Sequence, residues 1–195
     1  YGKNFDVFHI KSFRNEKNSL DDALYTICTP DSAIIHANDI WREFPKRISK
    51  QIKSSIKSIP IKNRLYMSQT NIASGFPIIY NCYTREEKEA IQKEHVSKII
   101  IDGLKNAYNI NALNFHSYAG MAIPFVKGKD YYLESSIYPS FKYITDNINS
   151  DLLKKVKILD FYPGDIYNFQ EVKRSFFDRT IYDKPIRDAT IKYYK

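Results

Sequence analysis

The sequence predicts an α/β domain with a mixed, mostly parallel sheet flanked by helices, arranged as a three-layer α/β/α sandwich. Short apolar segments rich in β-branched and aromatic residues alternate along the chain with longer segments whose apolar residues recur at helical spacing. The 195 residues have the size of one domain, and no repeat, low-complexity tract or linker divides them. We expect one domain over residues 1–195, with a C-terminal extension of no clear period at 179–195.

The first third of the chain predicts two strands and then helix. Residues 5–13 alternate in hydropathy, and residues 23–29 are rich in β-branched and aromatic side chains. The polar pair at 38–39 suits a helix N-terminus, and apolar residues recur every fourth position from 40 to 56. Because Pro45 interrupts this stripe, we expect two short helices that meet there.

The middle of the chain predicts two strands followed by a long helix. Residues 64–70 and 78–84 have strand-like composition, with a turn between them at Ser74 and Gly75. Thr84 and Glu87 have the spacing of a capping box, which begins a helix that reaches about residue 108.

The last third predicts two more pairs of strand and helix. We expect residues 121–126 to form a buried strand and residues 138–148 to form a helix with proline near its start. Residues 156–162 form another strand, and an Asn-x-x-Glu cap at Asn168 begins a helix that extends to about residue 177.

Familiar catalytic and cofactor motifs are missing from the sequence. It contains no phosphate-binding loop of the GxxxxGK[ST] type, no GxGxxG, no HExxH, no CxxC and no GxSxG. The four histidines show no metal-ligand spacing, and His95 falls on the apolar side of the long helix, where a packed core residue is expected. We therefore expect neither a metal nor a cofactor.

Two cysteines, Cys28 and Cys82, lie in apolar strand-like segments, which predicts inert buried thiols and a reducing, intracellular, cytoplasmic setting. The chain begins at Tyr1, so we expect a processed product or a piece of a longer polypeptide.

The chain is basic, with a net charge of +8. Residues 46–62 are rich in lysine and free of acids, which fits either a solvated face or a phosphate-contacting patch. No apolar run approaches the roughly 20 residues of a membrane span, so we expect no membrane span in this chain.

The order of these segments resembles the macro domain family, and within it the small branch of terminal ADP-ribose glycohydrolases. The similarity begins with NSLDDALYTICTPDSAIIHANDIWREFPK, continues with PIIYNCYTREE and its helix, then with MAIP, and closes with VKILDFY. It covers residues 5–177 in pattern and order, with few identities. The resemblance implies a macro-like fold that binds ADP-ribose or a related nucleotide.

The resemblance also implies roles for particular residues. It places Asn38 near the distal ribose with Asp39 beside it, and it places the second phosphate loop at Lys127, Gly128 and Lys129. The branch's catalytic Lys and Asp fall near Arg85 and Asp130. Arginine stays protonated and cannot serve as an amine nucleophile, whereas Asp130 retains the chemistry of a general base.

Two departures from the family bear on its ligand. Residues 32–39 lack the glycines of the first phosphate loop, and the acidic residue that holds the adenine amine is replaced near Lys11 and Ser12. In place of bare glycine amides, Lys127 and Lys129 offer charge-assisted hydrogen bonds to a diphosphate.

Three hypotheses follow for the function. The first is a module that binds an ADP-ribose-like nucleotide with weak or no hydrolysis. The second is a macro-like fold with a lost pocket, which serves as a basic interaction module for RNA, DNA or other domains of a parent polypeptide. The third is an active ADP-ribose glycohydrolase that acts through Asp130.

Overall fold

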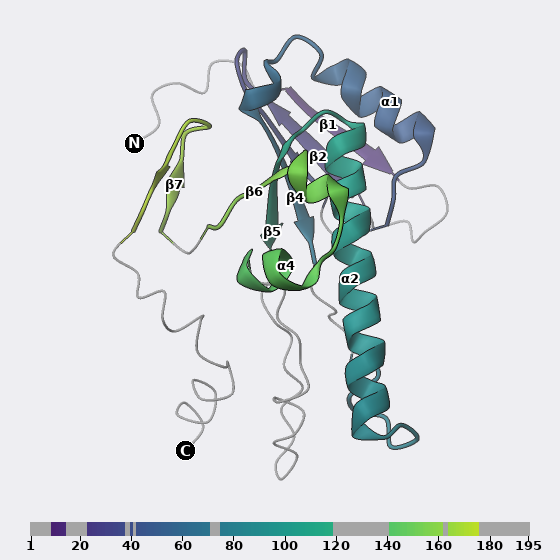
Figure 1. Ribbon diagram of the computed structural model, residues 1–195. Helices are drawn as coiled ribbons and strands as arrows, with labels where there is room; N and C mark the ends of the chain where they lie inside the picture. Colours follow the sequence, from purple (N-terminus) through teal and green to yellow (C-terminus); the bar gives the residue numbers. More distant parts are fainter. Residues whose placement is uncertain are drawn as a thin grey trace. The chain divides into compact units, whose positions relative to one another are not determined.

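The structure is a computed structural model, shown in Figure 1, and its contacts group into two compact units that are described separately. The described residues are 9–14, 23–37, 40, 42–70, 75–118, 141–161 and 164–175. The first unit comprises Tyr1–Thr70, Lys98–Ala119 and Pro139–Asp160. The second comprises Asn71–Ser97, Gly120–Tyr138 and Phe161–Lys195.

The first unit is built on a six-stranded mixed sheet whose strands lie side by side in chain order. These strands are β1 (His9–Arg14), β2 (Ala23–Cys28), β3 (Ala33–His36), β4 (Arg64–Gln69), β5 (Asn114–Tyr118) and β6 (Lys157–Ile158). The first two pairings are antiparallel and the next three are parallel. The predicted α/β class with a mixed, mostly parallel sheet is confirmed.

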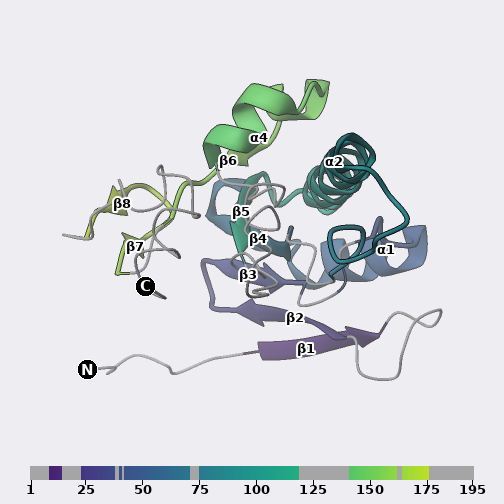
Figure 2. The ribbon, with the colours of Figure 1, turned by 90° about the horizontal axis from the view of Figure 1, so that it is seen from below.

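Three helices connect the parallel strands. They are α1 (Lys46–Ser55) between β3 and β4, α2 (Arg85–Asn109) between β4 and β5, and α4 (Phe141–Asn147) between β5 and β6. Successive crossovers of one hand that step in one direction place their helices on one face of a sheet. Figure 2 shows α1, the later part of α2 and α4 on the same side of the sheet. The described residues do not test the predicted helix layer on the opposite face of the sheet.

The core of the first unit lies between the sheet and these helices. Tyr66 on β4 and Phe115 on β5 are register partners, point to the same face and are both fully buried. Gly103 on α2 lets the helix approach them, since a Cβ there would lie 3.1 Å from Phe115 Cε2. Ile35, Ile52 and Ile100 fill the same layer and are also fully buried. This burial of apolar surface is the main stabilising term of the unit.

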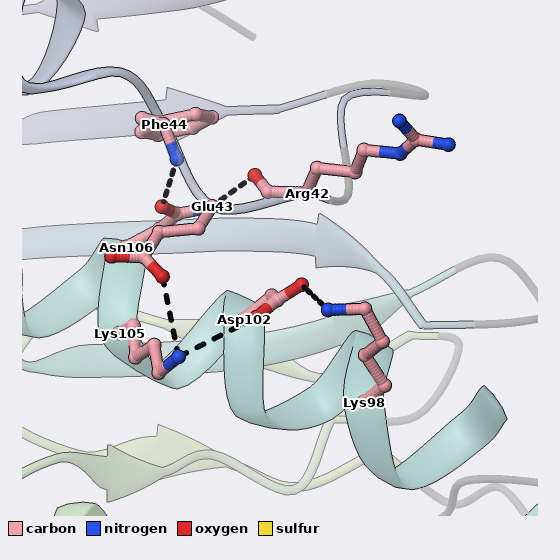
Figure 3. Close-up of polar contacts among 7 residues, drawn as sticks. All are labelled: Arg42, Glu43, Phe44, Lys98, Asp102, Lys105 and Asn106. Atoms are coloured by element: carbon pink, nitrogen blue, oxygen red, sulfur yellow. Dashed lines mark hydrogen bonds and ion pairs between the residues drawn. The ribbon is translucent and has the colours of Figure 1, made fainter. Parts of the chain in front are cut away.

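A buried amide joins three parts of this unit, and Figure 3 shows its contacts with the segment before α1. The Asn106 side chain on α2 accepts a 2.7 Å hydrogen bond from Phe44 N–H and donates to the Arg42 carbonyl at 2.9 Å. It also donates to the Tyr66 hydroxyl at 3.3 Å. Burial raises the pKa of Tyr66 to about 12, so this hydroxyl is neutral throughout the physiological range.

The same close-up shows a charged cluster on α2 around the buried Asp102. The Asp102 carboxylate lies 3.1 Å from Lys98 Nζ and 3.8 Å from Lys105 Nζ. Lys105 also pairs with Glu43 at 3.2 Å, which ties the segment before α1 to α2.

The second unit contains the first half of α2 and a small hairpin. The predicted capping box is confirmed: Thr84 N–H donates to Glu87 Oε2 at 2.7 Å, and Glu87 N–H donates to Thr84 Oγ1 at 3.2 Å. The hairpin pairs β7 (Ile166–Tyr167) with β8 (Val172–Lys173). The buried Asp165 carboxylate accepts from Ser175 N–H at 2.7 Å and pairs with Arg174 at 3.1 Å, which closes the hairpin.

Two predicted elements are wrong because local contacts replace them. Residues 78–84 form turns instead of a strand, with hydrogen bonds from Ile79 N–H to Gly75 O and from Tyr80 N–H to Pro77 O. The predicted helix after Asn168 is the β7–β8 hairpin. Asn168 Oδ1 accepts from the N–H groups two and three residues on, and this pattern closes a tight turn as well as it caps a helix.

Smaller differences concern element limits. Helix is described only after Pro45, so one helix replaces the expected pair, and strand β5 was not predicted. The predicted strand at 121–126 lies outside the described residues. His95 is exposed and contacts Phe76, with ring centroids 5.8 Å apart, instead of lying in the core.

Candidate functional site

The candidate site is the edge of the sheet where the parallel strands end. Because β3, β4, β5 and β6 run parallel, their carboxyl ends share one edge, which is where ligands bind in open α/β sheets. β3 and β5 both neighbour β4 and end at this edge, and β5 extends two residues further than β3 in the register.

Hydrogen bonds beyond the strand ends hold this edge in place. Ala37 N–H donates to the Met67 carbonyl at 2.9 Å, and Leu159 N–H donates to the Phe115 carbonyl at 2.8 Å. The hydroxyls of Thr70 and Ser117 hydrogen-bond to each other across β4 and β5. These hydrogen bonds hold the ends of the neighbouring strands together.

An aromatic pair spans this edge. His36, the last residue of β3, and Tyr118, the last residue of β5, have ring centroids 4.6 Å apart with an interplanar angle of 30°. Their register partners are Met67 and Gln69, which alternate with Tyr66, so the pair lies on the sheet face opposite the helices. Both rings are half-buried. Such a surface can stack on a planar base.

A second histidine, His116, lies two residues before Tyr118 on β5. His116 Nδ1 and the Leu159 carbonyl are 3.1 Å apart, and since a carbonyl only accepts, Nδ1 carries the proton. Burial lowers the pKa of His116, although the Leu159 carbonyl and Asp160 act in the opposite direction. Burial also lowers the pKa of His36. Both imidazoles are thus held neutral near neutral pH.

The residues that the sequence singled out are only partly within the described regions. Arg85 is the first residue of α2, in the second unit, where its exposed guanidinium pairs with Glu89 at 3.0 Å. The other candidates lie outside the described residues: Asn38, Asp39, Lys127, Gly128, Lys129 and Asp130. By chain position, Asn38 and Asp39 follow the end of β3 by two and three residues. Their roles stay predictions.

The remaining chemistry of the described residues is sparse. They contain no group of three or more side chains suited to a metal ion. Cys28 is half-buried and Cys82 is exposed, so the expectation of two buried thiols is wrong. No helix among the described residues has the length and apolar character needed to cross a bilayer.

The contact between His36 and Tyr118 was not predicted from the sequence. Its signal was available in the alternation of NFHSY, which would have placed Tyr118 at a strand end had that strand been predicted. Comparisons with family models, with curated proteins and with solved structures each found no match.

Proposed function

We propose that this chain is a macro-like module that binds ADP-ribose or a related nucleotide at the carboxyl ends of β3, β4 and β5. The observation that carries the proposal is the ring pair of His36 and Tyr118, which spans the ends of β3 and β5. The sequence resemblance supports a ligand at this edge of the sheet, since Asn38, which falls near a ribose of the ligand in that family, follows the end of β3 by two residues.

The proposed binding mode assigns each ligand part a physical partner. The base stacks on the ring pair, where stacking contributes about 1–3 kcal/mol. The Asn38 amide hydrogen-bonds to a ribose hydroxyl. By the sequence resemblance alone, Lys127, Gly128 and Lys129 are candidates for charge-assisted hydrogen bonds to the diphosphate, and Asp39 is a candidate in the first phosphate loop.

Hydrolysis is proposed to be weak or absent. Arg85 stands where the resembling branch has its catalytic lysine, and a guanidinium stays protonated at all physiological pH values. In this chain it also pairs with Glu89. Asp130 is the remaining candidate for a general base, and it does not replace an amine nucleophile.

The experiment is calorimetric titration of the chain with ADP-ribose, ribose 5-phosphate and inorganic phosphate. We expect saturable binding of ADP-ribose, weaker binding of ribose 5-phosphate and none of phosphate alone. Asn38→Ala should weaken ADP-ribose binding, whereas Asn147→Ala, at an exposed position on α4, should leave it unchanged. No ADP-ribose binding at millimolar concentration would refute the proposal.

A further inference from the structure

The segment that contains α1 has an unusual distribution of charge. No Asp or Glu occurs between Glu43 and Glu86, and five lysines fall within this stretch. Helix α1 has no acidic residue in its first turn. Carboxylates in the first turn normally stabilise a helix, because the helix N-terminus carries partial positive charge.

The lysines of this segment form a row. Lys46, Lys50 and Lys53 occur at i, i+4 and i+7 on α1, and this spacing places them on one stripe of a helix. Lys57 continues the spacing in the turn after the helix. We call these four residues the lysine row. All four are exposed, whereas Ile48 and Ile52 on the other side of α1 are buried.

The lysine row has no counter-charge among the described residues, in contrast to several other lysines of the first unit. Lys98, Lys142 and Lys154 have carboxylate partners at 3.1, 2.7 and 2.9 Å. Like charges one turn apart repel each other and destabilise a helix. This arrangement is costly for α1 by itself, and an external polyanion would offset the cost.

We propose that the lysine row binds the phosphodiester backbone of a nucleic acid. A linear polyanion matches a linear row of cations about one helical turn apart. A membrane surface is disfavoured, because the apolar side of α1 faces the core and its exposed residues Lys46, Arg47, Lys50, Gln51, Lys53 and Ser54 include no large apolar side chain. This inference is independent of the proposed nucleotide site.

The test is fluorescence anisotropy with labelled duplex DNA, duplex RNA and single-stranded RNA of one length, titrated with the full chain at several salt concentrations. If four phosphates are contacted, a plot of log affinity against log salt concentration should have a slope of roughly −3.6 for a duplex. Affinity for the duplex should then fall about 150-fold between 50 and 200 mM salt. A single strand should give a slope of roughly −2.8. The probe that binds with the highest affinity identifies the type of nucleic acid that the lysine row prefers.

Two variants with the same change in net charge distinguish a specific effect of the lysine row from a general effect of charge. Lys50→Gln/Lys53→Gln/Lys57→Gln should bind at least about tenfold more weakly and lose only about fourfold in affinity over the same salt range. Lys142→Gln/Lys154→Gln/Lys155→Gln removes the same charge elsewhere and should behave like the parent chain. Circular dichroism of both variants should show unchanged helix content, because every substituted residue is exposed.

Three outcomes would overturn the inference: equal loss of affinity in both triple variants, no binding to any nucleic acid at 50 mM salt, or binding to anionic vesicles or acidic peptides but to none of the nucleic acids.

Discussion

The side chain of Asn106 and the backbone N–H of Phe44 lie 2.7 Å apart and form a buried hydrogen bond between α2 and the segment that leads into α1. The same amide also reaches Arg42 O and the hydroxyl of Tyr66 on β4. One side chain thus fixes the separation of a helix, a loop and a strand. Because the loop connects the carboxyl end of β3 to α1, this amide also positions the edge proposed to bind the nucleotide.

Replacement of this amide is predicted to be costly. Asn106→Ala leaves the buried Phe44 N–H without its acceptor and removes the hydrogen bonds to Arg42 O and to the Tyr66 hydroxyl, so we expect the free energy of unfolding to fall by about 2–4 kcal/mol. Urea denaturation followed by circular dichroism measures the change. Asn147→Ala removes an exposed amide that bonds to Tyr143 O and should cost well under 1 kcal/mol. Equal losses in the two variants would contradict the role given to Asn106.

The capping box is predicted to stabilise the start of α2. Thr84→Ala removes the hydroxyl that accepts from Glu87 N–H, and we expect a loss of about 1 kcal/mol. Thr84→Ser keeps the hydroxyl and should restore most of it. Hydrogen exchange of the Glu87 amide reports on this bond directly, and it should accelerate in Thr84→Ala alone. Unchanged exchange in that variant would show that the box does not hold in solution.

Stability is predicted to fall on mild acidification. Burial lowers the pKa of His116 and of His36 below the ordinary value of 6.5. The unfolded chain therefore binds more protons than the folded chain below pH 6.5, and the free energy of unfolding decreases as pH falls through 6.5 toward the folded pKa. Urea denaturation at pH 7.5 and pH 5.5 measures this decrease.

The variant His36→Gln/His116→Gln should show a smaller decrease over the same range. His95→Gln, at an exposed position, serves as the control and should keep the decrease of the parent chain. A double variant with the same pH dependence as the parent would contradict the assignment to these two histidines.

Hydrolysis of ADP-ribosylated protein is predicted to be weak or absent, because Arg85 does not supply an amine nucleophile. Release of ADP-ribose from a modified substrate protein measures this. Rapid release that Asp130→Ala abolishes would contradict the prediction.

Local signals in the sequence predicted the elements that depend on local interactions. The capping box marked the start of α2 within one residue, and β-branched and aromatic composition marked β2 and β4. The segment at 78–84 has similar composition but lies in turns, where Phe76 contacts Tyr80 and Tyr83. No feature of composition distinguishes an apolar strand from an apolar turn that packs on its own aromatic residues.

The candidate site was less predictable because it depends on pairing between distant strands. His36 and Tyr118 are brought together only by the parallel register of β3, β4 and β5. The lysine row, in contrast, was visible as an acid-free basic stretch. What the sequence alone left open was which lysines share a stripe and which have carboxylate partners.

The most direct test of the proposed nucleotide site uses Tyr118. In calorimetric titration with ADP-ribose, we predict that Tyr118→Ala lowers affinity by about tenfold or more through lost stacking, while Tyr118→Phe retains it. Tyr108→Ala, which removes an exposed tyrosine from α2, should bind like the parent chain. Equal ADP-ribose affinity in the parent chain and in folded Tyr118→Ala would contradict the site.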